Sequence, residues 1–318
     1  ANCRIGEEWK LGGLIPYGTI ELSPAAGVLN YGQGCFEGTK AYRTIKNQVV
    51  LFRPEMNAKR MAMSTRRLCI PEMNKEFFLQ AVEETLIDNI DYVPPYGKGS
   101  LYIRPIVWGT SPALGVKPVE EYTFMVFVSP VGPYFKGGVK PLRLTVSNDY
   151  HRAAPKGIGN AKAIGNYSAS LYPLTEAKNR DFDEVIFLNA KDEKFVEEVG
   201  SANLFVLTGN TIKTPKLDGS ILPGITRDSV ITLAKDTIGL EVLETNVTLT
   251  ELYDADEVFC TGTAVIVTPV GSITGLDGKH KIADGKMGQL TSKLRQLLTG
   301  IQRGDVSDEF GWLYPIKE

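Results

Sequence analysis

Lys162 lies inside a glycine-rich segment, directly before a stretch that predicts a helix. The segment reads Gly157-Ile-Gly-Asn-Ala-Lys-Ala-Ile-Gly-Asn-Tyr167. It is not a Walker loop, which needs Gly-Lys followed by Ser or Thr, and a lysine stands where the dinucleotide fingerprint needs its third glycine. A desolvated lysine amine, or one close to other cations, is a nucleophile near neutral pH and forms Schiff bases with carbonyl compounds. The segment indicates a Schiff-base lysine, with a solvated loop lysine as the alternative.

Glu198 ends an apolar run and is followed by the polar residues Ser201 and Asn203, in the segment Phe195-Val-Glu-Glu-Val-Gly-Ser-Ala-Asn203. Taken alone, this pattern also fits an exposed acid in a hairpin. A carboxylate in such a position can hold a pyridine nitrogen protonated, and the ring then accepts electrons from a carbanion. The segment therefore indicates a partner for a heteroaromatic nitrogen.

Three further features could bind an anion. The segment 221–227 (Ile-Leu-Pro-Gly-Ile-Thr-Arg) leads into a predicted helix, with Thr226 as the expected N-cap. The N–H groups of a helix start attract phosphate. The small residues of 261–264 (Thr-Gly-Thr-Ala) predict a turn with backbone donors, or alternatively a β-bulge. Arg60, on a predicted helix, is either a surface residue or a charge-assisted phosphate anchor.

Hydrophobic periodicity predicts the elements that must position these residues. The first part of the chain has helical spacing at 54–68 and 75–89, and short apolar runs predict strands at 48–52, 100–108 and 122–128. The second part is richer in strands. Its predicted strands are 142–148, 184–189, 203–208, 211–213 and 257–269, and its predicted helices are 167–180, 227–238 and 288–299.

A connector separates the two parts. Residues 130–141 contain three prolines and three glycines, a composition typical of a loop. We therefore expect a smaller N-terminal domain at 1–132, an interdomain loop at 133–141 and a larger domain at 142–318.

The composition favours small-molecule chemistry. The 318 residues are 43% hydrophobic and 23% charged, with a formal net charge of -2, so nothing calls for nucleic acid or a membrane as a partner. The four cysteines and two histidines are scattered, which argues against a metal site or a disulfide framework. No apolar run approaches the roughly 20 residues of a membrane helix.

The chain resembles the branched-chain amino acid aminotransferases of pyridoxal-phosphate fold type IV over nearly its whole length. The resemblance implies an α/β (mixed α+β) fold with a smaller N-terminal α/β domain and a larger C-terminal pseudo-barrel domain. It also implies pyridoxal 5'-phosphate as cofactor, and transamination between L-leucine, L-isoleucine or L-valine and 2-oxoglutarate. Six segments carry it in series: 29–43 (Leu-Asn-Tyr-Gly-Gln-Gly-Cys-Phe-Glu-Gly-Thr-Lys-Ala-Tyr-Arg), 100–105 (Ser-Leu-Tyr-Ile-Arg-Pro), 159–167, 198–203 (Glu-Val-Gly-Ser-Ala-Asn), 221–227 and 261–269.

The family pattern implies roles at matching positions for the cofactor. Lys162 would hold it covalently and move the proton between substrate carbon and cofactor. Glu198 would face the ring nitrogen, and Tyr167 would bind the ring hydroxyl. The phosphate would be held by Arg60, Ile225, Thr226 and Thr261, and the remaining cofactor-binding residues would be Ser201, Leu222 and Thr263.

The same pattern implies roles for the substrate. Thr263 and Ala264 would receive its carboxylate, and Arg104 is our candidate for the distal carboxylate of 2-oxoglutarate, directly or through Tyr102. An apolar pocket would separate the three branched-chain substrates only weakly, since burial contributes about 0.8 kcal/mol per CH2. The pocket would be lined by Phe36, Tyr31 and Tyr102, with Leu114 and Val116 lent by a neighbouring subunit, which implies a homodimer or a higher homo-oligomer.

The sequence departs from the family pattern in two places. Some members carry a CxxC redox switch where Val265 and Thr268 stand here, so we predict no such switch. Members usually have several tens of residues before the segment that matches 3–18, including an aromatic residue that covers the substrate, and we expect that segment to be truncated or disordered here. We expect the protein in the cytoplasm, or in an organelle matrix if a transit peptide has been removed.

Three other activities fit parts of this pattern. A D-amino-acid aminotransferase of the same fold would need a different carboxylate trap, and the Glu37-Gly-Thr-Lys and Tyr102-Ile-Arg segments speak against it. The apolar pocket disfavours a lyase of the aminodeoxychorismate type. A catalytically silent protein that binds pyridoxal phosphate would not need Lys162 and Glu198.

Overall fold

The computed structural model describes residues 1–132 and 139–317. The chain forms two compact units: Ala1–Pro133 with Ala161–Gly165 and Ile301–Glu318, and Tyr134–Asn160 with Asn166–Gly300. Residues 133–138 of the predicted interdomain loop lie outside the described residues. The sequence-based division assigns everything after 141 to the second domain, whereas the contacts group 161–165 and 301–318 with the first unit; the predicted domain limits remain a prediction.

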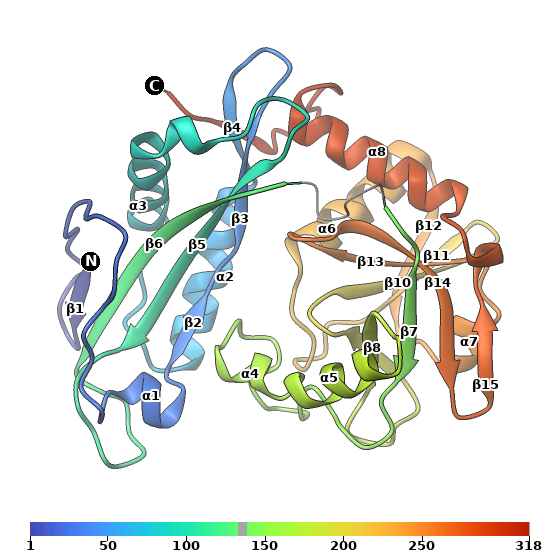
Figure 1. Cartoon of the computed structure of the whole chain (residues 1–318), viewed down its shortest axis with the longest axis horizontal. Coiled ribbons are helices and arrows are strands. Elements are labelled where there is room, and N and C mark those ends of the chain that lie inside the picture. Colours follow the sequence, from blue (N-terminus) through green and yellow to red (C-terminus); the bar gives the residue numbers. More distant parts are fainter. Residues whose placement is uncertain (133–138, 318) are drawn as a thin grey trace. The chain divides into compact units, whose positions relative to one another are not determined.

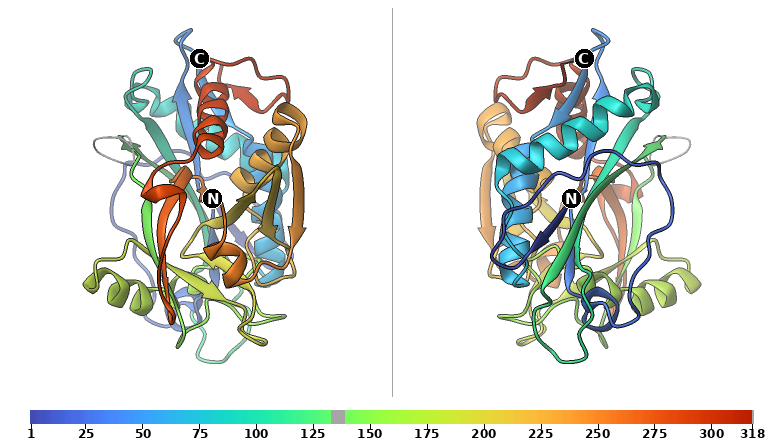
Figure 2. Two further views of the ribbon diagram at one scale, coloured as in Figure 1. Left: turned by 90° about the vertical axis from the view of Figure 1, so that its right-hand side faces the viewer. Right: turned by 90° about the vertical axis from the view of Figure 1, so that its left-hand side faces the viewer.

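The first unit is an antiparallel sheet with helices packed on it (Figures 1 and 2). Its strand order is β1 (Asn2–Arg4), β6 (Glu121–Val131), β5 (Ser100–Gly109), β3 (Thr39–Arg43), β4 (Val49–Phe52) and β16 (Leu313–Pro315), and β2 (Gly34–Phe36) also pairs with β5. Its helices are α1 (Gly27–Tyr31), α2 (Pro54–Arg67), α3 (Lys75–Asp88) and the 3-10 turn η1 (Ile90–Tyr92).

The core of this unit explains why α2 and α3 lie on the sheet. Met61 of α2 and Phe78 of α3 are fully buried in one cluster with Leu101 and Ile103 of β5. These positions follow the helical and strand periods on which the sequence prediction rests. Both helices begin where their local sequence predicts, α2 with Pro54 in its first turn and α3 after Asn74, whose side chain accepts from the Phe77 N–H at 2.7 Å.

The second unit is built round a strongly bent, mixed sheet (Figure 1). Strands that lie far apart in the sheet order, such as β9 and β10, contribute to one buried core. The strand order is β12 (Glu241–Thr245), β11 (Thr211–Pro215), β10 (Asn203–Thr208), β13 (Glu257–Gly262), β14 (Ile266–Gly275), β7 (Leu142–Val146), β8 (Glu184–Leu188) and β9 (Val196–Val199), with β15 (Gly278–Lys281) on β14. The helices are α4 (Gly165–Ser168), α5 (Leu171–Asn179), α6 (Ile225–Thr232), the π-helix η2 (Leu233–Ile238), α7 (Leu249–Tyr253), the 3-10 turn η3 (Ala283–Gly285) and α8 (Gln289–Arg303).

Three predicted elements are each divided in the structure. The helix predicted at 227–238 is α6 followed by the π-helix η2. The strand predicted at 257–269 is a hairpin, because β13 and β14 pair antiparallel round the small-residue turn at 263–265. The helix predicted at 167–180 is two helices, α4 and α5. None of the helices in the described part of the chain is long and apolar enough to cross a membrane.

Candidate active site

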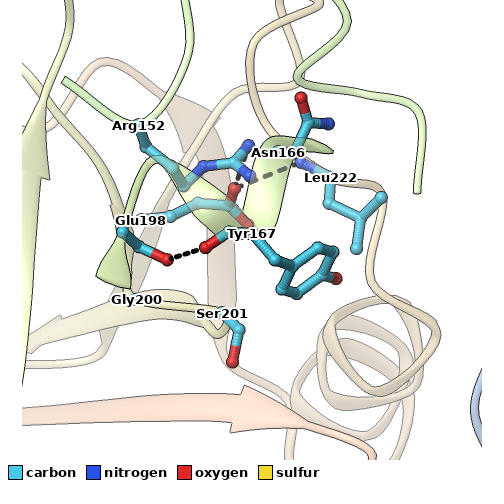
Figure 3. Close-up of a pocket in the computed structure, with 8 residues that line it drawn as sticks. Arg152, Asn166, Tyr167, Glu198, Gly200, Ser201 and Leu222 are labelled. Carbon is cyan, nitrogen blue, oxygen red and sulfur yellow. Dashed lines mark hydrogen bonds and ion pairs between the residues drawn. The ribbon is translucent and has the colours of Figure 1, made fainter. Parts of the chain in front are cut away.

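One pocket of the second unit collects four of the predicted cofactor residues. Tyr167, Glu198, Ser201 and Leu222 line it, although they come from α4, β9, the turn after β9 and the loop before α6 (Figure 3). The empty space inside the pocket is about 270 Å³, counted with its open mouth. The other lining residues are Arg152, Asn166, Ser170 and Gly200.

Glu198 is buried at 2% exposure and has polar partners on several sides. Its Oε2 forms an ion pair with the guanidinium of Arg152, as Figure 3 shows. Its Oε1 accepts from the Asn203 side-chain amide at 2.9 Å, and its Oε2 from the Leu222 N–H at 3.4 Å. A cation beside a buried carboxylate favours the ionised form. Glu198 is therefore an acceptor suited to a protonated ring nitrogen.

The neighbouring residue Glu197 points to the other side of β9, because side chains alternate along a strand. Its Oε1 accepts from the Ser220 hydroxyl at 2.5 Å. Burial raises the pKa of Glu197, and the nearby charge of Asp218 adds to this effect. Of the two adjacent glutamates, Glu198 is the one that lines the pocket.

Helix α6 offers an anion site close to these residues. The N-cap is Gly224, so the prediction of Thr226 as N-cap is wrong; Ile225 and Thr226 are the first two residues of the helix. The first N–H groups of an α-helix have no partner within the helix. Gly224 packs so closely on Asn203 that a Cβ there would lie 2.0 Å from Asn203 Oδ1. The Asn203 side chain therefore contacts both the start of α6 and the Glu198 carboxylate.

Thr261 adds a hydroxyl to the same neighbourhood. It pairs with Asn203 in the β10–β13 register and is 1% exposed. Its Oγ1 is buried and, within the described part of the chain, has no hydrogen-bond partner. Because a buried hydroxyl without a partner is costly, this atom fits a bound acceptor such as a phosphate oxygen.

The turn that contains Thr263 and Ala264 connects β13 to β14. Two side chains hold it through the Val265 carbonyl: the Thr268 hydroxyl donates to it at 2.8 Å, and Arg295 Nη1 at 3.2 Å. Thr268, one of the two positions compared above with a CxxC pattern, thus bonds back to the turn through its hydroxyl.

In the first unit, the backbone of Lys162 is attached to β2 and α2. Its carbonyl accepts from the Phe36 N–H at 3.1 Å, and its N–H donates to Ser64 Oγ at 2.9 Å. The ε-ammonium lies 4.7 Å from the centre of the Phe36 ring. The backbone of Lys162 is thus bonded to β2 and α2, with an aromatic ring beside its amine.

Arg60 forms a buried ion pair in this unit. Its Nε donates to Glu37 Oε1 at 2.7 Å and its Nη2 to Glu37 Oε2 at 2.8 Å. Asn57 also donates to Oε2, at 2.7 Å. Burial would raise the pKa of Glu37, but the charges of Arg60 and then Lys162 outweigh it and hold this pKa below its usual range. The role of Arg60 at a phosphate remains a prediction.

The predicted substrate residues of the first unit fall into two groups. Arg104 lies over the rings of Phe36 and Tyr102, at 4.6 and 5.2 Å, and its Nη2 donates to Tyr102 Oη at 3.0 Å. Tyr31 is 41% exposed at the end of α1, and Leu114 and Val116 are 85% and 90% exposed between β5 and β6. The structure therefore joins Phe36, Tyr102 and Arg104 in one cluster.

Sequence reasoning did not identify Arg152, Asn203, Ser64 and Glu37 as site residues. Asn203 and Glu37 occur in the quoted motifs, and their burial, at 5% and 0% exposure, is the signal that marks them. Arg152 and Ser64 have no spacing pattern that would single them out. Among the described residues, no group of three or more His, Cys, Asp or Glu side chains could hold a metal ion.

Comparisons with known proteins point to one family. Residues 34–273 match the family described as amino-transferase class IV. The chain is 50% identical to branched-chain-amino-acid aminotransferase 3, chloroplastic, of Arabidopsis thaliana, over 98% of this chain and 75% of that protein. It is 45% identical to the branched-chain-amino-acid aminotransferase of Mycolicibacterium smegmatis, over 97% and 87%.

Solved structures agree with these sequence matches. The branched-chain amino acid aminotransferase of Thermobaculum terrenum, in its PLP-bound holo form, superimposes with a TM-score of 0.80 at 28% identity, over 94% of each chain. The Escherichia coli branched-chain amino acid aminotransferase gives 0.79 at 30% identity, over 94% of each chain.

Proposed function

Because this chain belongs to the class IV aminotransferase family, we propose that it is a branched-chain amino acid aminotransferase that uses pyridoxal 5'-phosphate. It transfers the amino group of L-leucine, L-isoleucine or L-valine to 2-oxoglutarate, giving the branched-chain 2-oxo acids and L-glutamate. The observation that carries the proposal is the pocket in which Tyr167, Glu198, Ser201 and Leu222 come together from separate elements.

The chemistry of the donor set fits this cofactor. Pyridoxal phosphate supplies an electron sink through its pyridine ring. Glu198 would accept a hydrogen bond from the protonated ring nitrogen, and its ion pair with Arg152 favours the carboxylate form that this needs. Tyr167 would bind the ring hydroxyl from the same pocket. Lys162 would hold the cofactor through its Nζ, and once the substrate amine had displaced it, the freed Nζ would carry the proton to and from the substrate α-carbon.

The phosphate-binding residues follow the same logic. The backbone N–H groups of Ile225 and Thr226, at the start of α6, and the unpartnered hydroxyl of Thr261 are suited to phosphate oxygens. Arg60 adds a positive charge in our proposal, with Glu37 fixing its guanidinium.

For the substrate, Thr263 and Ala264 bind the α-carboxylate through the β13–β14 turn. Phe36 and Tyr102, with Tyr31, provide the apolar surface for the branched side chain. Arg104, which donates to Tyr102, is the cation for the distal carboxylate of 2-oxoglutarate.

We further propose a homodimer or higher homo-oligomer. Exposure of 85% and 90% at Leu114 and Val116 supports their predicted use by a neighbouring subunit, because apolar side chains at such exposure gain from being covered. The proposed compartment is the cytoplasm. The plant relatives with chloroplastic and mitochondrial names make an organelle matrix the alternative.

A half-reaction panel on the purified protein loaded with pyridoxal phosphate tests the function. L-leucine, L-isoleucine and L-valine should each convert the bound cofactor to its pyridoxamine form, followed by absorbance. Conversion by D-alanine without conversion by L-leucine would instead identify a D-amino-acid aminotransferase. No conversion by any amino acid would identify a silent binding protein or a lyase.

Borohydride reduction followed by peptide mass spectrometry tests the attachment site in the same protein. We expect the reduced cofactor on the peptide that contains Lys162. Lys156, in the same loop region and exposed, is the internal control. A label at any lysine other than Lys162 would contradict the assignment.

A further inference from the structure

Three hydrogen bonds fix the segment that carries Lys162 to the first unit. Two are backbone bonds to β2: Phe36 N–H to the Lys162 carbonyl at 3.1 Å, and Ile164 N–H to the Gly34 carbonyl at 3.0 Å. The third comes from a side chain, since the Lys162 N–H donates to Ser64 Oγ at 2.9 Å. Ser64 is fully buried at 0% exposure. Of these three bonds, the one from the Lys162 N–H is accepted by a side chain, the Ser64 hydroxyl of α2.

Ser64 belongs to a polar stripe along α2. Asn57, Arg60 and Ser64 are spaced at i, i+3 and i+7, so they lie on one face of the helix. Asn57 and Arg60 bind Glu37, next to β2, and Ser64 binds Lys162. One face of α2 thus contacts both the residue that follows β2 and the segment that carries Lys162.

The local sequence makes this anchor necessary. Serine has a lower helix propensity than alanine, so a buried serine in the last turn of α2 is not explained by helix formation. The lysine stem itself has several rotatable bonds. Precise placement of the amine then depends on contacts that hold the Lys162 backbone.

We propose that Ser64 is a positioning residue for Lys162: its hydroxyl oxygen accepts the Lys162 N–H and fixes the backbone from which the reactive amine extends. The proposal rests on the proposed function, in which Lys162 carries the cofactor. Ser64 acts through Lys162 and does not itself contact the reacting atoms. Loss of its oxygen leaves the Lys162 N–H without its acceptor and lets the segment move on β2.

The test compares Ser64→Ala and Ser64→Cys with Thr65→Val in the cofactor-loaded enzyme. Alanine removes the acceptor, and cysteine keeps the volume but replaces the oxygen by a weak sulfur acceptor. Thr65 is the matched control, because it is equally buried on the same helix and its hydroxyl donates to the Ala62 carbonyl at 3.0 Å. Residue-resolved amide hydrogen exchange, with and without pyridoxal phosphate, reports on the Lys162 N–H independently of activity.

We expect both Ser64 variants to speed exchange at the Lys162 amide by about tenfold or more, the factor that corresponds to about 1.4 kcal/mol. We also expect kcat to fall while KM changes little, because the defect is in placing the amine. Thr65→Val should leave both quantities near wild type. Unchanged exchange or unchanged kcat in Ser64→Ala overturns the proposal, and so does a Thr65→Val variant with the same defects.

Borohydride labelling of the wild type separates this inference from the proposed function. Labelling at Lys162 together with a silent Ser64→Ala variant overturns the inference alone. Labelling at another lysine overturns the assignment of Lys162, and the inference with it.

Discussion

Two adjacent glutamates on β9 meet different surroundings, and only Glu198 lines the pocket. Glu198 faces Arg152, Asn203 and the pocket, whereas Glu197 faces Ser220. An arginine charge favours an ionised carboxylate, and burial favours a protonated one. For Glu197 burial is the largest effect and raises the pKa, although Arg152 and His151 act in the opposite direction. We therefore propose Glu198, which forms the direct ion pair with Arg152, as the partner of the pyridine nitrogen.

Arg152 is therefore as important as the glutamate that it binds. Replacing Arg152 by methionine leaves a buried carboxylate without its cation, which costs about 3–5 kcal/mol or drives uptake of a proton. We expect a lower free energy of unfolding, and an altered absorbance of the bound cofactor because a protonated Glu198 no longer accepts from the ring nitrogen. Urea unfolding and absorbance spectra of the loaded enzyme measure the two effects.

The control for this prediction is Arg143→Met. Arg143 pairs with Asp183 at 3.2 Å, but the two side chains are 51% and 37% exposed. Loss of a surface pair costs about 0–1 kcal/mol. In a double-mutant cycle, Arg152→Met and Glu198→Gln should be non-additive. Additive effects would mean that Arg152 does not act through Glu198.

At the residue scale, the sequence was informative where a residue stands in a motif. Lys162 and Glu198 were singled out by their neighbours along the chain. Arg152 and Ser64 were missed because their importance comes from partners distant in sequence, Glu198 and Lys162. No local pattern encodes such contacts. Burial of a polar side chain in the folded state is what reveals them.

At the scale of the element, the start of α6 depends on a close approach between the backbone of Gly224 and the side chain of Asn203. A Cβ on Gly224 would lie 2.0 Å from Asn203 Oδ1. The Asn203 amide is itself held by bonds to Glu198 and to the Leu222 carbonyl, at 2.9 and 3.0 Å. Gly224 has φ of -69°, so alanine is excluded by space and not by backbone strain.

Gly224→Ala should therefore push the Asn203 amide away and loosen its bond to Glu198. We expect an overpacking cost of about 1–3 kcal/mol and weaker binding of pyridoxal phosphate. Thermal unfolding and a fluorescence titration with the cofactor measure these. Gly18→Ala is the control, since the nearest atom to its Cβ would be 4.0 Å away. Wild-type affinity in Gly224→Ala would show that Asn203 adjusts at no cost.

Elements with a clear period were predicted well, and short ones were not. The helix predicted at 75–89 is α3 (Lys75–Asp88), and the strand predicted at 203–208 is β10 (Asn203–Thr208). The three-residue strand β2 was missed, because three residues carry no measurable alternation. Yet β2 pairs with the Lys162 segment. The element most important for placing Lys162 was thus the one with the weakest local signal.

At the scale of the whole molecule, the first unit is assembled from three separate stretches of sequence. Residues 161–165 and 301–318 belong to it although they follow the connector. Trp312 shows why: its ring contacts Phe52 and Arg53, and its carbonyl accepts from the Arg53 N–H at 2.8 Å. Linker composition carries no information on whether a later segment packs back on an earlier one. The fold class was predictable from the family resemblance, whereas the grouping of residues 161–165 and 301–318 with the first unit was not.

The stability of the first unit should depend on pH through Glu37, whose carboxylate is fully buried against Arg60 and Asn57. Its pKa in the folded protein lies below the usual value of 4.5, because Arg60 and then Lys162 outweigh the effect of burial. A carboxyl group with a lowered folded-state pKa stabilises the protein above its unfolded-state pKa. This stabilisation is lost as the pH falls from that value through the folded-state pKa.

Glu37→Gln should be less stable than wild type at pH 7 by about 3–5 kcal/mol, because Arg60 loses its buried partner. The difference between the two proteins should shrink as the pH falls below about 4.5, where the Glu37 carboxyl of the unfolded chain takes up a proton. It should go on shrinking until the pH has fallen through the lower folded-state pKa, where the ion pair with Arg60 is lost. Urea unfolding at a series of pH values measures it, with Glu121→Gln, an exposed partner of Arg4, as the control. A difference that stays constant down to pH 3 would mean that Glu37 has the same pKa in the folded and unfolded states, and that the Arg60–Glu37 pair does not set the acid limit of this unit.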